Sequence, residues 1–278
     1  NLVNPLRSII YQARPNTMSD QRIPILVYHH VYRRGTPELE QAASGTGAGI
    51  LGEDEFRRQV DYLVSGGWSA LSTTQIVDWL ERGTPLPAKA LSLHFDNGWL
   101  DTAEVALPIL RQAGFCATCF PITDGVEDAS QGRSTAVRTH TEGVVEKPFM
   151  NWDQIASLVD QGWEIGAHTA THCKLADLQN DEGDEAVIGE ALNANQIFAQ
   201  RLGFVPAHFA YPSGSRNERT DEVLARYYRS LRLWHAEWPI RWTFTHAGTS
   251  QLAIDCQNID LRISFSDFAG LFAASVAQ

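Results

Sequence analysis

The chain has 278 residues, of which 44% are hydrophobic, and its 22 Lys and Arg against 33 Asp and Glu give a formal net charge of -11. This length and composition allow a full hydrophobic core within a single domain. The negative charge opposes binding to nucleic acid and to anionic membrane surfaces, and no apolar run approaches the roughly 20 residues of a membrane-spanning helix.

The chain begins with a segment that we expect to lie outside the domain. Residues 1–20 are predicted to form an N-terminal arm or extension, and residues 21–278 a single domain. The arm lacks the charged start and apolar core of a signal peptide. The sequence therefore favours a cytoplasmic protein, or a periplasmic or secreted one if a leader was removed. It does not indicate an oligomeric state.

Strand-like and helix-like segments alternate along the domain. In the first half we expect strands over 23–28, 90–95 and 116–122 and helices over 54–64 and 102–113. In the second half a helix capped by Asn151 is followed by strands over 163–167, 207–211, 230–233 and 261–264 and helices over 184–202, 221–228 and 265–274. Such units, with apolar strands, predict a parallel sheet covered by helices in a barrel-like α/β fold.

Two segments, 33–49 and 123–149, show no regular pattern. Loops of this length in a compact domain are usually functional lids or disordered. We therefore leave both without an element.

Polar motifs stand at the ends of three of the expected strands. Asp96 and Asn97 follow the strand over 90–95, His168 follows the strand over 163–167, and Tyr211-Pro212 end the strand over 207–211. Parallel strands bring such positions to one edge of the sheet, and active sites of α/β barrels lie at that edge.

These residue types are those of a metal-dependent hydrolase. His168 and His172 are four residues apart, so on one helical turn both imidazoles could reach a single metal ion. Asp96 could act as the general base for an attacking water. Each motif alone has a plainer interpretation, because spaced histidines are common and Asp-Asn-Gly is also a turn sequence. Their combination favours catalysis.

Together the motifs resemble the polysaccharide deacetylase family (NodB homology, carbohydrate esterase family 4) over residues 23–263. The family motif T-F-D-D-G appears as His94-Phe95-Asp96-Asn97-Gly98, and H-[ST]-x-x-H as His168-Thr169-Ala170-Thr171-His172. Residues 25–31, 151–155 and 209–212 resemble segments of the poly-N-acetylglucosamine deacetylases within that family.

The resemblance implies a single distorted (β/α)7 barrel and removal of an acyl group, first of all N-acetyl, from an amino sugar. By position, Asp96 would be the base, and Asn97, His168 and His172 would bind one divalent metal ion. Zinc is the first expectation, with nickel, cobalt or iron as alternatives. The residues expected to contact substrate are Tyr211, Pro212, Trp99 and His29.

Other expected site residues are less directly supported by the motifs. The family's late leucine-x-histidine motif is not matched, so His246 or His235 is left as general acid by elimination. Late tryptophans, Trp234 or Trp238, could line a cleft. The resemblance gives no function to His94, His140 and His208, and for His29 a structural hydrogen bond is the alternative.

Several positions depart from the family pattern. Asn97 stands where the family has aspartate, Ser213 where this branch has tyrosine, and no arginine precedes Tyr211-Pro212. An amide oxygen is a neutral and weaker ligand than a carboxylate. Three outcomes stay open for Asn97, namely a working metal site, a metal-free hydrolase, or a domain without catalysis.

Two other functions also stay open for the whole chain. One is a hydrolase of small-molecule amides, imides or esters on the same barrel. The other is a catalytically inactive, sugar-binding protein.

Overall fold

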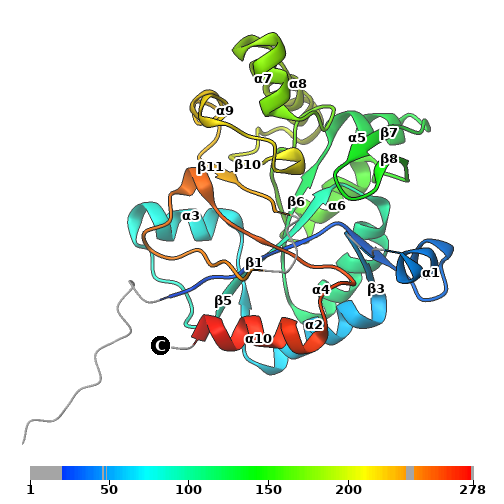
Figure 1. The fold of residues 1–278 in the computed structure, drawn as a ribbon, viewed down its shortest axis with the longest axis vertical. Coiled ribbons are helices and arrows are strands. Elements are labelled where there is room, and N and C mark those ends of the chain that lie inside the picture. Colours follow the sequence, from blue (N-terminus) through cyan, green and yellow to red (C-terminus); the bar gives the residue numbers. More distant parts are fainter. Residues whose placement is uncertain (1–20, 46, 48, 236–240, 277–278) are drawn as a thin grey trace, which may run out of the picture.

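A parallel β-sheet forms the centre of the molecule (Figure 1). The computed structural model describes residues 21–45, 47, 49–235 and 241–276, so the predicted arm and Trp238 lie outside the described residues. The strands run in the order β12-β1-β5-β6-β9, with β4 beside the start of β5. Their bounds are β1 (Ile25–Tyr28), β4 (Ser69–Ala70), β5 (Ala90–Asn97), β6 (Thr118–Pro121), β9 (Glu164–Ile165) and β12 (Gln257–Asn258).

Three two-stranded sheets adjoin this centre. The pairs β2 (His30–Tyr32) with β3 (Ile50–Gly52) and β10 (His208–Ala210) with β11 (Ser230–Arg232) are parallel, whereas β7 (Ala136–Thr139) and β8 (Gly143–Glu146) form an antiparallel hairpin. Isolated parallel bridges link Ala167 to Phe209 and Arg232 to Ile254. Through these bridges β10 and β11 continue the row of parallel strands.

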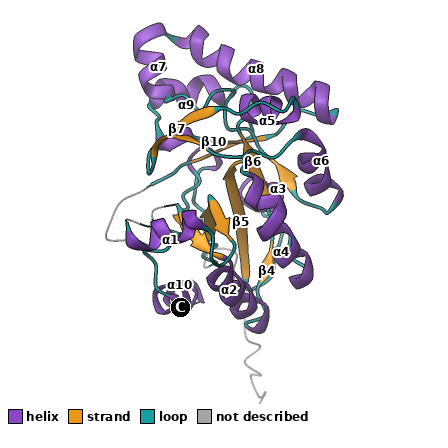
Figure 2. Cartoon of the chain, turned by 90° about the vertical axis from the view of Figure 1, so that its right-hand side faces the viewer, coloured by secondary structure: helices purple, strands orange, loops and turns teal. Residues whose placement is uncertain are grey.

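Helices surround the sheet, with α7 and α8 at the top of the view in Figure 2 and α2 and α10 at the bottom. Their bounds are α1 (Pro37–Ser44), α2 (Glu53–Ser65), α3 (Thr73–Arg82), α4 (Leu107–Ala113), α5 (Thr123–Ser130), α6 (Trp152–Asp160), α7 (Leu175–Glu182), α8 (Asp184–Leu202), α9 (Glu218–Leu224) and α10 (Phe265–Val276). Short turns of other helix types are η1 (Thr102–Ala106), η2 (Pro212–Gly214) and η3 (Gln251–Ala253). Within the described part of the chain, no helix is both long and apolar enough to cross a membrane.

Strand β5 shows how the core and the site share one element. All eight of its residues are buried, and Leu91, Leu93 and Phe95 pack in the main hydrophobic cluster. Because side chains alternate along a strand, the intervening His94 and Asp96 point to the opposite face. One side of the strand is therefore apolar and faces the helices. The other side is polar and faces the other strands.

The predicted α/β fold with a parallel central sheet is confirmed. The Asn151 cap is present too, because its side chain accepts a hydrogen bond from the backbone N–H of Gln154 at 2.9 Å. The strand expected over 261–264 is wrong, since the last strand is β12 (Gln257–Asn258). The carboxylate of Asp260 accepts hydrogen bonds from the backbone and the guanidinium of Arg262, which holds this segment in a turn.

The two segments without a predicted element are partly regular. Residues 33–49 contain α1, and residues 123–149 contain α5 and the β7–β8 hairpin. Helix α3 was also not predicted, although Ser72 and Gln75 form a reciprocal capping box at its start. The hairpin matters most for function, because it lies over the strand ends.

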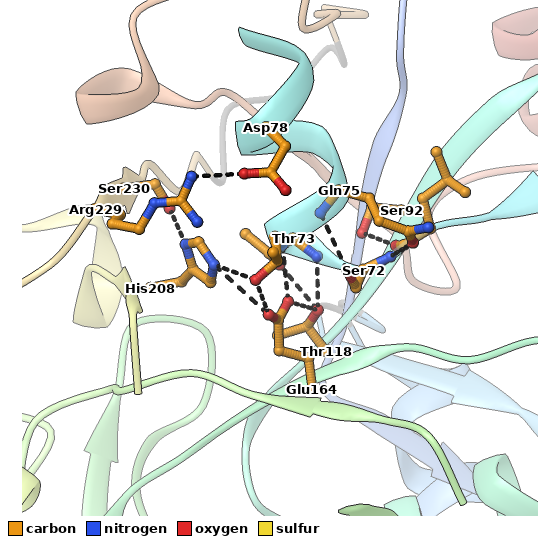
Figure 3. A network of polar contacts seen from close by, with 12 residues as sticks. Ser72, Thr73, Gln75, Asp78, Ser92, Thr118, Glu164, His208, Arg229 and Ser230 are labelled. Atoms are coloured by element: carbon orange, nitrogen blue, oxygen red, sulfur yellow. Dashed lines mark hydrogen bonds and ion pairs between the residues drawn. The ribbon is translucent and has the colours of Figure 1, made fainter. Parts of the chain in front are cut away.

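A polar network fills the opposite end of the sheet, where the N-terminus of α3 meets the amino ends of β6, β9 and β10 (Figure 3). The hydroxyls of Thr73 and Thr118 are 2.9 Å apart. The Glu164 carboxylate accepts hydrogen bonds from the backbone N–H and the hydroxyl of Thr74. The same hydroxyl lies 2.9 Å from Nε2 of His208. The partners of Thr73, Thr118, Glu164 and His208 offset the cost of removing these polar groups from water.

We expect His208→Asn to weaken the pH dependence of stability. Burial lowers the pKa of His208, although Glu164 raises it, so the unfolded chain takes up a proton below about pH 6.5 that the folded chain does not. This stability is complete above that pH and is lost as the pH falls. Removing one such group should reduce the slope by up to about 1.4 kcal/mol per pH unit, measured by urea unfolding between pH 7 and 5.

The matched control for this measurement is His246→Asn, because His246 is exposed. It should keep the wild-type slope. An unchanged slope in His208→Asn would contradict the prediction.

Candidate active site

Seven of the predicted site residues line one pocket at the carboxyl ends of the strands: His29, Asp96, Asn97, Trp99, His168, His172 and Trp234. The space that can hold the centres of water-sized groups is about 20 Å³. A volume of this size fits one or two water-sized species and no sugar ring. A larger substrate would therefore lie across the mouth and insert only a small group.

Asp96 is the residue before the end of β5 and is held by Arg232, the last residue of β11. Nη2 of Arg232 is 2.6 Å from both carboxylate oxygens, and each side chain is only 1% exposed. Burial raises the pKa of Asp96, but Arg232, His168 and His29 outweigh it and bring the value to about 2. Asp96 is thus a carboxylate at neutral pH and is fixed in place by Arg232.

Arg232 was not predicted from the sequence. It lies 20 residues after the third motif, on β11, which pairs with β10. Its contact with Asp96 depends on how these strands are arranged and is visible only in the folded structure. Its guanidinium also lies 5.1 Å from the centre of the Phe120 ring, and its Nη1 donates to the carbonyl of Leu233. The arginine missing before Tyr211-Pro212 is therefore matched in charge by one from the next strand.

The histidine pair does not lie on a helical turn, which corrects our expectation. Thr169 and His172 have φ of 63° and 65°, and a right-handed helix excludes such values. The two rings still face each other, with centroids 5.0 Å apart. The two motif histidines are brought together by a loop with left-handed residues instead of by helical spacing.

Both imidazoles are oriented by backbone carbonyls. Nδ1 of His168 is 2.8 Å from the oxygen of Ala210, and Nδ1 of His172 is 2.8 Å from that of Arg138. A carbonyl only accepts hydrogen bonds, so each Nδ1 carries the proton and each Nε2 keeps its lone pair. Burial lowers the pKa of both, to about 3 for His168. Neutral imidazoles with a free Nε2 are the form that binds metals.

Asn97 fits a ligand position beside them. Its backbone has φ of 73°, and its Oδ1 is buried without a hydrogen-bond partner among the described residues. An orphaned buried acceptor is rare and needs a partner. Across the described ranges there is no group of three His, Cys, Asp or Glu that could hold a metal ion. An amide oxygen with two imidazoles is nevertheless a usable donor set for a divalent cation.

His29 lines the pocket close to Asp96. Its Nε2 is 3.9 Å from Oδ2 of Asp96, and its ring lies edge-on to Trp234 at 6.0 Å. Burial lowers its pKa to about 4, against an opposing effect of Asp96. Its Nδ1 is buried and finds no partner in the described structure.

The β7–β8 hairpin completes the pocket, and no motif in the sequence indicated this. Residues 139–142 line the mouth, and the carbonyl of Arg138 orients His172. His140, to which we assigned no function, packs edge-on against Trp234 with ring centroids 5.4 Å apart. The unexpected third-motif residue Ser213, with φ of 53°, also lines the pocket.

Other predicted site residues lie elsewhere. His246 is exposed and follows Thr245, which pairs with Ile23 just before β1 begins, at the amino end of the sheet. His235 is near the surface, and its Nε2 is 3.0 Å from Asp255. Neither candidate acid is among the residues that line the pocket, although Trp234, next to His235, is one of them.

The third motif contributes backbone more than side chains. The hydroxyl of Tyr211 donates to Asp221 at 2.6 Å, and its buried ring packs on Phe209. Pro212 is buried and is not among the residues that line the pocket. We had expected both to contact substrate, but their side chains are used in the core. Trp99 lines the pocket as expected, yet it is fully buried and stacks on Phe149.

The architecture and this pocket define an α/β protein with a carboxylate and a histidine pair at the strand ends. The chain belongs to the polysaccharide deacetylase family, whose model matches residues 83–229, more than half of the chain. The family resemblance predicted from the motifs is thereby confirmed.

Two curated relatives share this family. YxkH of Bacillus subtilis, whose name refers to a polysaccharide deacetylase, is 22% identical over 73% of this chain and 61% of its own. The poly-β-1,6-N-acetyl-D-glucosamine N-deacetylase of Escherichia coli K12 is 28% identical over 41% of this chain and 17% of its own. The chain thus spans less than two thirds of either relative.

Solved structures show the same fold. A deacetylase of Streptococcus pyogenes, PplD, in complex with acetate has a TM-score of 0.72 at 21% identity, covering 90% of this chain and 98% of that one. IcaB of Ammonifex degensii has a TM-score of 0.70 at 20% identity, covering 92% and 98%.

Proposed function

We propose that the protein is a metal-dependent hydrolase that removes an acyl group, most simply N-acetyl, from an amino sugar of a polysaccharide. The observation that carries this proposal is the shared pocket of Asp96, Asn97, His168 and His172. Its small volume suits an acetyl group better than a larger acyl chain. Family membership and the named activity of the E. coli relative support the choice of an acetylated sugar.

The Nε2 atoms of His168 and His172 and Oδ1 of Asn97 would hold one divalent cation. Zinc is the first candidate, with nickel, cobalt and iron as alternatives. When bound, such an ion polarises the scissile carbonyl and makes water more acidic. The hydrogen bonds to Ala210 and Arg138 keep both imidazoles oriented for this task.

The chain's own residues would then move the protons. Asp96, kept ionised by Arg232, takes a proton from the attacking water. His29, with Nε2 3.9 Å from Asp96, would receive that proton from Asp96 and pass it to the leaving nitrogen. His246 lies near the amino end of the sheet, away from this pocket. Trp234 and the hairpin residues 139–142 would cover the sugar at the mouth.

We also propose a finer description of the fold. The bridges of β9 to β10 and of β11 to the segment before β12 support a closed, distorted (β/α)7 barrel for residues 21–278. These two bridges lie at the positions where neighbouring strands would have to pair for the row of strands to form a closed ring.

Release of acetate from N-acetylglucosamine oligomers tests the proposed function. We expect release from the metal-loaded protein, its loss after chelation, and its return when zinc or another divalent ion is added back. Release from aryl acetates or simple amides alone would favour a small-molecule hydrolase. Sugar binding without release from any of these compounds would favour a catalytically inactive domain.

A further inference from the structure

A second cavity lies beside the candidate active site, between β2, η1 and the residues after β8. Its space for water-sized groups is about 340 Å³, against about 20 Å³ in the catalytic pocket. This is within the range of small-molecule sites. The aromatic and charged residues that line it include Tyr32, Glu38, Asp101, Glu104, Glu146 and Lys147.

A stack of aromatic rings connects the two cavities. The His30 ring lies between Tyr32 and Trp99, with centroid distances of 4.9 and 4.8 Å and interplanar angles of 18° and 22°. Trp99 lines the catalytic pocket, whereas His30 and Tyr32 line the second cavity. The half-buried ring of Tyr32 therefore gives this cavity an apolar wall one ring stack away from the catalytic pocket.

The charges around the Tyr32 ring are mostly negative. Asp101 is already used, since its carboxylate binds His30 Nδ1 at 2.7 Å. Lys147 pairs with Glu142, and its Nζ also lies 5.5 Å from the centre of the Tyr32 ring. Arg33 lines the same cavity and donates to the backbone carbonyl of Glu104, so the carboxylates of Glu38, Asp101, Glu104 and Glu146 outnumber two cations. Through the part of the chain that the structure describes, the side chains of Glu38 and Glu104 make no ion pair or hydrogen bond.

The electrostatics of Tyr32 agree with this balance. Burial raises the pKa of its phenol, and the carboxylates of Asp101, Glu142 and Glu38 raise it further. All three act in the same direction because each adds negative potential at the ring. A ligand that is favoured here should present a positive charge beside a face that can pack on an aromatic ring.

We propose that this second cavity binds a hexosamine unit with a free amine, so that the protein acts on polysaccharide chains that are already partly deacetylated. The sugar ring would pack on Tyr32, and its ammonium group would face Glu38 and Glu104. An acetylated unit is neutral and gains nothing from these carboxylates. The inference rests on the proposed function, because deacetylation in the catalytic pocket produces the amine that this cavity would bind.

The surroundings favour a polymer over a free monosaccharide. A third cavity, with about 500 Å³ for water-sized groups, shares Glu146, Lys147 and Pro148 with the second. A chain could therefore continue from one cavity into the other along the end of β8. A single sugar would occupy only one of these two adjoining cavities.

Binding of a glucosamine tetramer tests the proposal, with a glucose tetramer as the uncharged comparison. We expect wild-type protein to bind the glucosamine tetramer more tightly in a calorimetric titration. The double variant Glu38→Gln/Glu104→Gln should lose about fivefold in that affinity, since two exposed charge contacts are removed. Tyr32→Leu should weaken both tetramers, because it removes the ring.

The control is Glu182→Gln/Glu185→Gln, which removes the same charge from the exposed surface around the start of α8. It should bind both tetramers like the wild type. Equal affinity of the wild type for the two tetramers, or equal losses in the two double variants, would overturn the proposal. Failure of the proposed function shows differently, as absence of acetate release from acetylated oligomers by wild-type protein.

Discussion

Arg232→Met should lower acetate release by about 100-fold or more and reduce the free energy of unfolding by about 3–5 kcal/mol. Arg232 and Asp96 are both 1% exposed, so loss of the cation leaves a buried carboxylate without its counter-charge. Removing one partner of a buried pair costs more than the pair itself contributes. Rates and urea unfolding curves measure the two effects separately.

The pH profile separates a catalytic effect of Arg232 from mere loss of stability. Burial raises the pKa of Asp96, and Arg232 is the largest opposing influence that brings it to about 2. Without Arg232 that pKa must rise, so the acid limb of the rate, below which the base is protonated, should move to higher pH. Asp96→Asn should lose most activity at every pH, because it has no base to titrate.

Two further arginine variants control this experiment. Arg232→Lys keeps the charge but loses the planar guanidinium, so we expect an acid limb close to that of the wild type with an intermediate rate. Arg229→Met removes a half-exposed arginine that pairs with Asp78 and Glu81 at the other end of the sheet, and should cost about 1 kcal/mol or less. An unmoved acid limb in Arg232→Met would show that Arg232 does not tune the base.

Asn97→Asp should tighten binding of a divalent metal by about tenfold or more, because a carboxylate replaces a neutral amide at the proposed ligand position. Aspartate tolerates the positive φ of this position, so the backbone can stay as it is. His172→Ala should weaken binding by more than about 100-fold, since even changes to the partners of metal ligands cost up to that much. Competition with a chromophoric chelator measures both affinities.

Asn217→Asp is the matched control for added charge. Asn217 caps α9, a position where aspartate serves equally well, and it lies outside the pocket. Metal affinity should not change in this variant. If Asn97→Asp also binds metal like the wild type, Asn97 is outside the coordination sphere and the proposed ligand set is incorrect.

The motifs could be placed from the sequence because each follows a buried strand. The hydrophobic run over 90–95 predicts a strand, and its end puts Asp96 at the carboxyl edge. The same argument places His168. The motifs did not predict the local backbone conformation. Thr169 and His172 have φ values of 63° and 65°, so the segment is a loop where the spacing suggested a helical turn.

The residues that sequence reasoning missed act over long separations in the chain. Arg232 reaches Asp96 across 136 positions, and the Arg138 carbonyl reaches His172 across 34. Neither contact follows from a local pattern, since each depends on which strand or hairpin lies beside which. His246 was proposed as the general acid by elimination along the sequence. It lies at the other end of β1, away from the pocket.

By itself, the sequence determined the α/β class and the family, and it pointed to Asp96 and to the pair His168 and His172, because periodicity and short motifs are local properties. The tertiary structure decided which carbonyls fix the imidazoles, which cation holds the base, and that Tyr211 belongs to the core instead of the pocket. These depend on packing between segments distant in sequence. Asn97 depends on both the sequence and the tertiary structure. The motif located it beside Asp96, and the structure shows that its side-chain oxygen is buried without a partner and is available to bind a cation.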